Sequence, residues 1–373
     1  MNVVFRVDAS AEIGSGHLMR CLALAERLRK EKNVNISFIS RDLQGNLSHI
    51  IQQKSFMVCH LPFAEADDTK AGYARWLAVS QEIDAKETSE CILHMRMKPD
   101  WLIVDHYAID ATWERKVRPF VKRIFVIDDL ADRVHECDAL LDQSPDPKLE
   151  NYYERLVPSG CKRFFGPPYA LFREEFFQAQ QSKMYKCGTH IPKVALVTFG
   201  GSDSTNETEK VLFALAAIDQ ADILIHVVVG ASNPRREIIR KLSRKDSRVR
   251  YHCQIDYMAK LLQEVDFVIG APGTSLWEWC FLRIPSLVIA VADNQKLCAD
   301  YRTNPDICVY LGETENVSQE KIKNVLEEIF SGKRNLNNVR KAYKQYFPQG
   351  SRMEDMIEFI TEEVDNDALG KSN

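Results

Sequence analysis

A glycine-containing loop near the start of the chain ends in a histidine and carries residue types suited to proton transfer. The segment VDASAEIGSGHLMR places Gly14 and Gly16 between an apolar run and a helical pattern. Glycine permits backbone conformations that other residues resist, and it leaves room for a ligand beside the main chain. His17 would lie at or near the helix N-terminus, where a neutral imidazole can act as a general base. The alternative is a tight turn in which His17 only caps or packs.

Two charged residues precede this loop in an otherwise apolar strand. Arg6 and Asp8 are two positions apart, so they lie on the same face of the strand. Charges in such a place are costly unless paired, which favours a structural Arg6–Asp8 ion pair. The alternative is that Asp8, at the carboxyl end of the strand, reaches a substrate or orients His17.

The glycine loops fit the common cofactor fingerprints poorly. A dinucleotide-binding loop would need a third glycine at position 19, which is Met19, and no carboxylate clearly ends the second strand. A later loop, TFGGSDSTN, lacks the G-K-[ST] of a Walker loop, so ATP hydrolysis is not expected. We therefore expect no NAD and no other cofactor.

Two loops in the second half of the chain suit an anionic ligand. Their candidate binding residues are Gly200, Gly201, Ser202, Gly273, Thr274 and Ser275. Each loop follows an apolar run and opens a helix, and backbone N–H groups there can bind a diphosphate. We expect Thr274 and Ser275 to cap the second helix, with Glu278 about one turn later accepting hydrogen bonds from ribose hydroxyls. The alternative is a plain turn and cap, with Glu278 an exposed first-turn acid.

Two further strand ends carry polar residues. In ADNQ, Asn294 and Gln295 offer donors and acceptors suited to sugar hydroxyls or an acetamido group, although a simple cap is the alternative. In VDHY, Asp105, His106 and Tyr107 would either face the cleft on which the loops above open or form a solvated loop. The histidines elsewhere have no metal-ligand spacing, so we predict no metal site.

The elements that position these loops alternate between strands and helices. Runs such as VALVTF and ILIHVVV are apolar on both faces, as in a parallel sheet covered by helices. Strands separated by helix-length segments indicate βαβ units. One helical pattern is especially regular, with apolar residues at Leu18, Cys21, Leu22, Ala25 and Leu28 and Arg20 among the polar residues between them.

The stretch from Gln143 to about Ile191 interrupts this alternation, and we expect the crossing between two similar halves there. The predicted fold class is α/β, with two Rossmann-like domains facing a cleft at the carboxyl ends of both sheets. The predicted bounds are 1–165 for an N-terminal domain carrying the His17 loop, 190–345 for a C-terminal nucleotide-binding domain, and 346–373 for a C-terminal helix and tail. From Val364 the tail is polar, and we expect it to fray.

Composition narrows the classes of function. The chain has 373 residues and a formal net charge of −4, which argues against a nucleic-acid binder. Ten cysteines are scattered singly without C-x-x-C, and some, such as Cys59 and Cys253, sit in apolar runs. We therefore expect a reduced, cytoplasmic protein. No signal peptide and no membrane-spanning run is apparent, and we expect a monomer.

Taken together, the loops resemble a known enzyme family. The segments that carry the resemblance are FRVDASAEIGSGHLMRCLALA, VDHY, FGGSD, GTSLWE and DNQ. The family is the UDP-2,4-diacetamido-2,4,6-trideoxy-β-L-altropyranose hydrolases of pseudaminic acid biosynthesis, and the wider resemblance is to lipid II-type glycosyltransferases with the glycosyltransferase B fold. The resemblance covers roughly residues 1–345, and its G-x-G-H-x-x-R block is the most specific part.

The resemblance implies roles for particular residues. His17 would activate water, the Gly200–Gly201 loop and the 273–278 segment would hold UDP, and Glu278 would bind the ribose. Asn294 and Gln295 would lie near the sugar, and Ile255 would belong to the segment that reads uracil through backbone groups. Pro272 and Trp277 depart from the family pattern, which leaves the detail of that loop open.

The leading hypothesis is a hydrolase that releases UDP and free sugar by cleavage at the anomeric carbon. UDP is a stable leaving group when amide donors hold its charge, so a second carboxylic acid is not needed. Attack by water opposite the diphosphate would invert the anomeric centre. The alternatives are a glycosyltransferase of the same fold that uses a UDP-sugar donor, and a binding module without catalysis.

Overall fold

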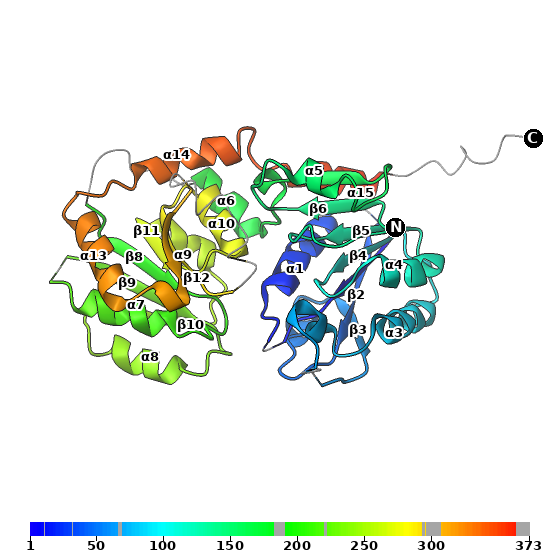
Figure 1. The fold of residues 1–373 in the computed structure, drawn as a ribbon, viewed down its shortest axis with the longest axis horizontal. Helices are drawn as coiled ribbons and strands as arrows, with labels where there is room; N and C mark the ends of the chain where they lie inside the picture. Colours follow the sequence, from blue (N-terminus) through cyan, green and yellow to red (C-terminus); the bar gives the residue numbers. More distant parts are fainter. Residues whose placement is uncertain are drawn as a thin grey trace, which may run out of the picture.

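Two parallel sheets organise the computed structural model, and each occupies its own lobe (Figure 1). The first sheet has seven strands in the order β3-β2-β1-β4-β5-β6-β7. Its strands are β1 (Asn2–Val7), β2 (Asn35–Arg41), β3 (Met57–Leu61), β4 (Trp101–Asp105), β5 (Arg123–Ile127), β6 (Ala139–Asp142) and β7 (Lys162–Phe165).

The second sheet has six strands in the order β10-β9-β8-β11-β12-β13. These are β8 (Val194–Thr198), β9 (Leu224–Val229), β10 (Val249–Cys253), β11 (Phe267–Gly270), β12 (Ser286–Ala290) and β13 (Val309–Glu313). Both sheets therefore contain the 3-2-1-4-5-6 order of the dinucleotide-binding fold, and the predicted α/β class with two Rossmann-like halves is confirmed. In such sheets ligands bind beyond the carboxyl ends of the strands where the order reverses, which is at β1/β4 and at β8/β11.

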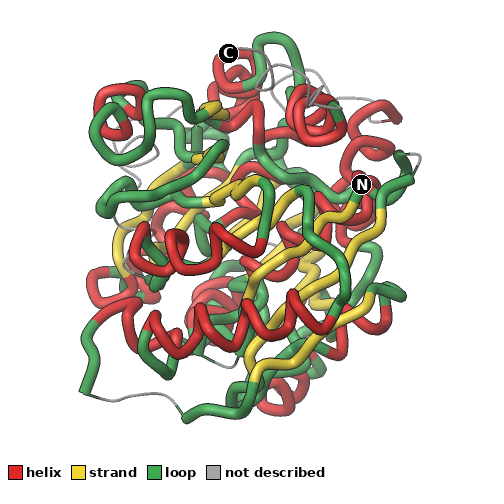
Figure 2. Tube along the Cα trace, turned by 90° about the vertical axis from the view of Figure 1, so that its right-hand side faces the viewer, coloured by secondary structure: helices red, strands yellow, loops and turns green. Residues whose placement is uncertain are grey.

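Helices pack along the sheets, as Figure 2 shows for the lobe turned toward the viewer. The helices of the first lobe are α1 (Gly16–Leu28), α2 (His49–Gln53), α3 (Gln81–His94), α4 (Ala111–Val117) and α5 (Leu149–Tyr153). Those that follow are α6 (Glu174–Ser182), α7 (Glu207–Ala216), α8 (Arg236–Ser243), α9 (Met258–Glu264), α10 (Thr274–Phe281), α13 (Gln319–Phe330), α14 (Asn337–Tyr346) and α15 (Met353–Thr361). Short 3-10 turns are η1 (Gly72–Leu77), η2 (Arg118–Phe120), η3 (Pro167–Tyr169) and η4 (Thr314–Asn316).

The structure describes residues 1–362 apart from 11, 32, 66–68, 183–190, 220–221, 293–294 and 296–306. Asn294 and the tail from Val364, both singled out from the sequence, lie outside the described residues. Within these ranges, no helix is both long and apolar enough to cross a bilayer.

The apolar face predicted for the first helix is confirmed in α1, because all five of its periodic apolar residues are buried. Arg20, which the pattern assigned to the polar residues between them, is also buried, with 5% of its surface exposed. Its carboxylate partners, Asp105 and Asp129, compensate for the burial of its charge.

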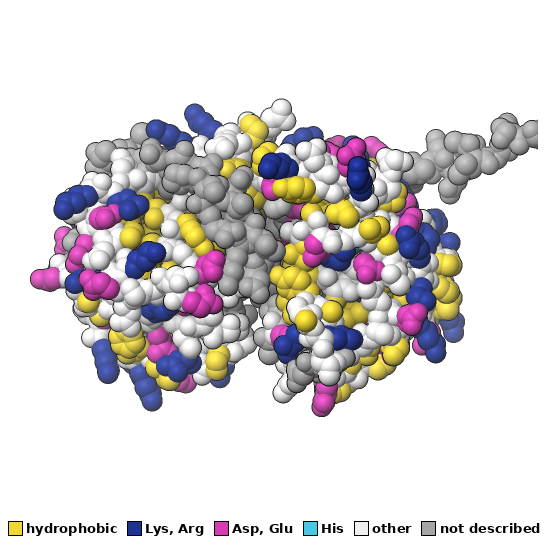
Figure 3. Space-filling view, in the orientation of Figure 1, with side chains coloured by type: hydrophobic (Ala, Val, Ile, Leu, Met, Phe, Trp, Pro, Cys, Tyr) yellow, Lys and Arg dark blue, Asp and Glu magenta, His cyan; other side chains and the backbone are white. Residues whose placement is uncertain are grey.

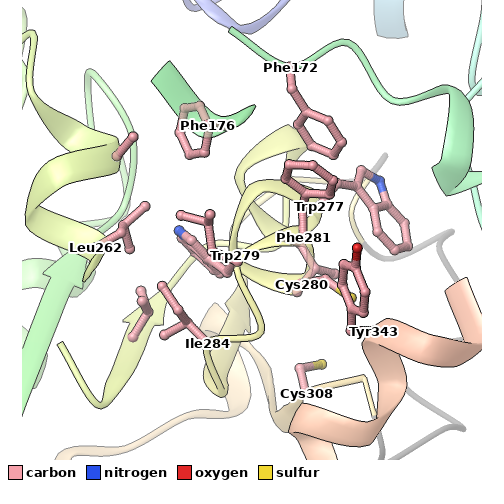
Figure 4. Packing of buried hydrophobic residues seen from close by; sticks show 14 of the residues in the cluster. Phe172, Phe176, Leu262, Trp277, Trp279, Cys280, Phe281, Ile284, Cys308 and Tyr343 are labelled. Carbon is pink, nitrogen blue, oxygen red and sulfur yellow. The ribbon is translucent and has the colours of Figure 1, made fainter. Parts of the chain in front are cut away.

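The core of the second lobe fixes α10 against the segment that joins the lobes. Phe172 stacks on Phe281 with ring centroids 4.6 Å apart, and Trp277 and Trp279 of α10 are buried in the same cluster (Figure 4). The Trp277 side chain therefore belongs to the core, which explains how this helix accommodates a large ring. α10 is held as a rigid support for the loop that precedes it.

Two expectations need correction. The stretch from Gln143 to Ile191, where we expected the crossing between the halves and no strand, contains β7, which completes the first sheet, together with α5 and α6. Cys59 was expected to be a free thiol, but it forms a disulfide with Cys91, which brings β3 and α3 together.

The helix near the C-terminus, α15, packs in the core of the first lobe. The division at 1–165, 190–345 and 346–373 stays a prediction.

Candidate active site

His17 is the second residue of α1 and is held by a carboxylate from the neighbouring strand. Its Nδ1 lies 2.6 Å from Oδ1 of Asp105, the last residue of β4. The pairing of β1 with β4 aligns Val7 with Asp105, so the loop after β1 and the end of β4 meet at the point where the strand order reverses. The His17 side chain is 10% exposed, whereas Asp105 is fully buried. This arrangement orients the imidazole while leaving part of it accessible.

Arg20 completes the support of His17 from the next turn of the same helix. Its Nε donates to Asp105 Oδ2 at 2.6 Å and its Nη2 donates to Oδ1 at 2.7 Å, and it also pairs with Asp129. Burial alone would raise the pKa of Asp105, but Arg20 and His17 outweigh it and hold the pKa well below its ordinary value. Asp105 is therefore an anion that can accept the Nδ1 proton of His17.

Tyr107 closes the site on another side. Its hydroxyl donates to Asp129 Oδ2 at 3.0 Å, and its ring meets the His17 ring edge-on at 4.5 Å between centroids. Burial, reinforced by Asp129, raises the pKa of Tyr107 well above its ordinary value, so the phenol stays protonated. Tyr107 thus lies in the same cluster as His17, and its part in binding a substrate stays a prediction.

Asp8 occupies a different, fully buried network. Arg6 donates to both of its carboxylate oxygens, at 2.5 and 2.9 Å, and the backbone N–H of Arg41 donates to it at 2.7 Å. His106 Nε2 lies 3.3 Å from Asp8 Oδ2, which places His106 in this network and away from His17. The structural Arg6–Asp8 pair is present, and Asp105 takes the position next to His17 that was considered for Asp8.

The Gly200–Gly201 loop of the second lobe faces the His17 loop of the first. A Cβ on Gly201 would lie 3.7 Å from Ser15 Oγ, the residue just before α1. Gly230, just after β9, packs closely against the backbone of this loop. A Cβ at position 230 would lie 2.3 Å from the Gly201 carbonyl oxygen, so a larger residue would displace the loop. Gly200 has a φ of +79°, which favours glycine. Gly14, with the same φ, and Gly16 have open space around them.

The first turn of α7, just after this loop, is already occupied by a side chain. Asp203 accepts hydrogen bonds from the backbone N–H groups of Glu207 and Thr208, at 2.9 and 3.0 Å. Those amides therefore do not offer a site for an external anion. The candidate donors of this loop are instead the glycine amides and the half-buried Ser202 upstream of Asp203.

The loop before α10 is different, because its N-cap position is a glycine and no described side chain is hydrogen-bonded to the first N–H groups of the helix. The helix begins at Thr274 with Gly273 as its N-cap, and no side-chain capping hydrogen bond is formed. Thr274 and Ser275 were expected to be caps, but they are the first two helical residues. The positive end of the α10 dipole therefore lies just after β11, at the switch point of the second sheet.

Glu278 lies one turn into α10, beside the segment that joins the lobes. Its Oε1 is 3.6 Å from Nη2 of Arg173, and its side chain is 18% exposed. Burial raises the pKa of Glu278 to about 7, although Arg173 opposes the shift. Gln295 also reaches this loop, with its Nε2 3.8 Å from where a Cβ on Gly273 would be.

Ile255 lies in the loop after β10. It is half-buried, and its side chain packs against the core of the second lobe. Among the described residues, no group of three His, Cys, Asp or Glu side chains is arranged to hold a metal ion. Figure 3 shows both charge signs interspersed over the two lobes on the face in view.

Three residues of the site were not predicted in their roles from the sequence: Arg20, Asp105 and Asp129. Asp105 was recognised only as part of a strand end, and its contact with His17 depends on β1 pairing with β4. The i to i+3 spacing of His17 and Arg20 on one helix could have placed them on the same face. Asp129 lies beyond the next strand, β5, and nothing local links it to His17.

These observations define a class of protein: two Rossmann-like lobes whose switch points face each other, the glycosyltransferase B fold. Solved structures with this fold cover almost the whole chain. MurG of Acinetobacter baumannii matches with a TM-score of 0.60 at 10% identity, over 96% of this chain and 99% of that one. Arabidopsis thaliana UGT89C1 complexed with UDP matches with a TM-score of 0.64 at 13% identity, over 96% and 99%.

Sequence relatives support the resemblance inferred from the motifs. The chain is 27% identical over 305 residues to the UDP-2,4-diacetamido-2,4,6-trideoxy-beta-L-altropyranose hydrolase of Campylobacter jejuni, covering 81% of this chain and 96% of that protein. It is 26% identical to an uncharacterized protein of Methanocaldococcus jannaschii over 80% of this chain, but it spans only 58% of that relative's length. It is 24% identical to the spore coat polysaccharide biosynthesis protein SpsG of Bacillus subtilis, over 89% of each. No family model matches the chain.

Proposed function

We propose that this protein hydrolyses a UDP-linked 2,4-diacetamido-2,4,6-trideoxy sugar at its anomeric carbon, giving UDP and free sugar, as a step of pseudaminic acid biosynthesis. The observation that carries the proposal is the 2.6 Å contact between His17 Nδ1 and the ionised Asp105, at the switch point of the first sheet. The similarity to the Campylobacter jejuni hydrolase supports the substrate class.

In this proposal His17 is the general base, and its contact with Asp105 supports that role. Asp105 accepts the proton on Nδ1, so the lone pair that can take a proton from water lies on Nε2. The oxygen of that water then bonds to the anomeric carbon while the bond from this carbon to the UDP oxygen breaks, and UDP leaves with the electron pair. Attack and departure on opposite faces invert the anomeric centre. Arg20 is a positioning residue, because it acts through Asp105.

The second lobe supplies the binding of UDP in this proposal. The amides of the Gly200–Gly201 loop and the uncapped start of α10 lie at the switch point of the second sheet, where they would stabilise the charge on the diphosphate. Glu278 would accept hydrogen bonds from the ribose hydroxyls, and the backbone around Ile255 would face the uracil. Because UDP is already a stable leaving group, no second acid is required of the first lobe.

A glycosyltransferase is the second candidate, since a UDP-glucosyltransferase of Polygonum tinctorium shares the fold with a TM-score of 0.64. The two candidates differ in whether water or another molecule accepts the sugar. Incubating the protein with UDP-2,4-diacetamido-2,4,6-trideoxy-β-L-altropyranose alone, and following UDP by phosphorus NMR, separates them. We expect UDP and free sugar in equal amounts. A donor that stays intact until a hydroxylated acceptor is added would contradict hydrolysis and favour transfer.

A further inference from the structure

An aromatic cluster stands beside His17 and is not used by the mechanism above. Trp76 meets the His17 ring edge-on, with centroids 5.7 Å apart, and lies nearly parallel to the Tyr107 ring at 5.8 Å. Tyr73 contacts both of these neighbours, at 4.7 Å from Trp76 and 5.1 Å from Tyr107. We call Tyr73, Trp76 and Tyr107 the aromatic wall.

The wall is only partly covered by protein. Tyr107 is 6% exposed, whereas Tyr73 and Trp76 are half-buried. Tyr73 and Trp76 each keep part of a large ring in water. The fold therefore does not gain the free energy that full burial of these rings would give. A ligand that covers these rings would recover that free energy.

The segment that carries Tyr73 and Trp76 is held firmly at the site. Both residues lie on η1, whose last residue, Leu77, is buried in the core of the first lobe. Arg75 of the same turn pairs with Glu12 at 2.6 Å, and Glu12 belongs to the loop that leads to His17. The wall and the base are therefore positioned together.

The other partners of His17 are charged, but the two that hold the imidazole are covered by protein. Asp105 is fully buried and Arg20 almost fully buried, and Asp129 accepts from the Tyr107 hydroxyl. A ligand next to His17 would therefore meet the partly exposed rings of Tyr73 and Trp76 before it met Asp105 or Arg20. Hydroxyl groups pressed against the rings would lose hydrogen bonds to water, whereas methyl and acetamido methyl groups would gain by burial.

We infer that Tyr73 and Trp76 form the sugar-specificity surface of this site, and that they favour a sugar whose C6 is a methyl group over one that carries a hydroxyl there. The inference rests on the proposed function, because it concerns the sugar attached to UDP. Trp76 contributes most, since its indole contacts His17 as well as both tyrosines. The wall acts on the sugar alone, and UDP is bound by the other lobe.

Binding experiments can isolate this effect from catalysis. His17→Asn removes the base and so keeps the donor intact during titration calorimetry. In that background we would compare Trp76→Ala, Trp76→Phe and a control, Tyr152→Ala, which removes a 43% exposed ring on α5. The ligands are UDP, the UDP-linked diacetamido-trideoxy sugar, and the same donor with a hydroxyl at C6, so that the two donors differ at C6 alone.

We expect Trp76→Ala to weaken binding of the deoxy sugar donor by about tenfold or more, within the range for a lost apolar contact in a pocket. Affinity for UDP should stay unchanged, affinity for the donor with a C6 hydroxyl should fall less, and Trp76→Phe should restore most of the loss. If Trp76→Ala lowered the affinity for both donors equally, or for neither, while UDP bound normally, the role of the aromatic wall would be refuted and the proposed function would stand. If the His17→Asn protein with its wall intact bound no UDP, the proposed function itself would fall.

Discussion

The two lobes share a strand order but end their strands differently. In the first lobe, strands end in carboxylates that are fully or almost fully buried, at Asp8, Asp105, Asp128 and Asp142. In the second lobe, glycine follows or ends three strands, at Gly200, Gly230 and Gly270. Buried carboxylates must be held by cations or hydrogen-bond donors, whereas glycines let backbone approach backbone or ligand. This difference is the basis for proposing proton transfer in the first lobe and anion binding in the second.

The largest effect should be a loss of catalysis when the proposed base of the first lobe is removed. His17→Ala should lower kcat by roughly 100- to 10,000-fold, the usual contribution of a general base, because the variant lacks the Nε2 that would take the proton from water. Affinity for UDP should not change, since we propose that the second lobe binds it. His60→Ala is a matched control, because His60 also pairs with a carboxylate, Asp42 at 2.8 Å, but is 34% exposed at another edge of the sheet. An unchanged kcat for His17→Ala would refute its role.

The next largest effect should fall on stability. Asp8→Ala leaves buried Arg6 with only one carboxylate partner, Asp84, and should cost about 3–5 kcal/mol in the free energy of unfolding. Denaturant unfolding measures the loss, with the 39% exposed Asp42→Ala as the control. UDP affinity of the folded fraction should match the wild type. A large loss of UDP affinity with normal stability would instead give Asp8 a role in binding.

A smaller loss is expected at the start of α7. Asp203→Ala removes the acceptor for two backbone N–H groups and should cost about 0.5–2 kcal/mol, the usual contribution of a helix cap. Ser318→Ala at the start of α13, where the hydroxyl accepts from Lys321 N–H at 3.1 Å, is a matched cap far from the crevice. If the glycine amides upstream bind the diphosphate, UDP affinity should change little in either variant. A stronger loss of UDP binding in Asp203→Ala alone would show that the cap shapes the binding loop.

The smallest effect should appear in the pH dependence of UDP binding. Burial raises the pKa of Glu278 to about 7 from 4.5, so the folded chain holds this proton more tightly than the unfolded chain. Raising the pH from about 4.5 to about 7 therefore costs stability at this residue. The ionised carboxylate is the better acceptor for ribose hydroxyls, so UDP affinity should rise roughly fivefold as the pH passes upward through about 7.

Glu278→Gln should remove this part of the pH profile, and the remainder reports the ionisation of UDP itself. Glu150→Gln, at a 67% exposed carboxylate, should leave the profile as in the wild type. Identical profiles for wild type and Glu278→Gln, measured by titration calorimetry at several pH values, would remove Glu278 from the binding site.

The sequence predicted the features that local patterns determine. The parallel sheets follow from apolar runs separated by helical periods, and the position of His17 follows from the glycine loop that opens α1. The Arg6–Asp8 pair follows from the period of a strand. The sequence did not predict the contact of Asp105 with His17, because this contact depends on which strands are neighbours. Trp76 was missed because it lies on a short 3-10 turn within a long connection, where no period identifies a face.

The central claim is that water activated in the first lobe attacks the anomeric carbon while the second lobe retains UDP. The most direct test is to run the reaction in water enriched in oxygen-18 and to measure by mass spectrometry which product carries the label. The account predicts one heavy oxygen in the released sugar and none in UDP. Heavy oxygen in the nucleotide product, with an unlabelled sugar, would mean that a phosphorus–oxygen bond breaks and would contradict the mechanism.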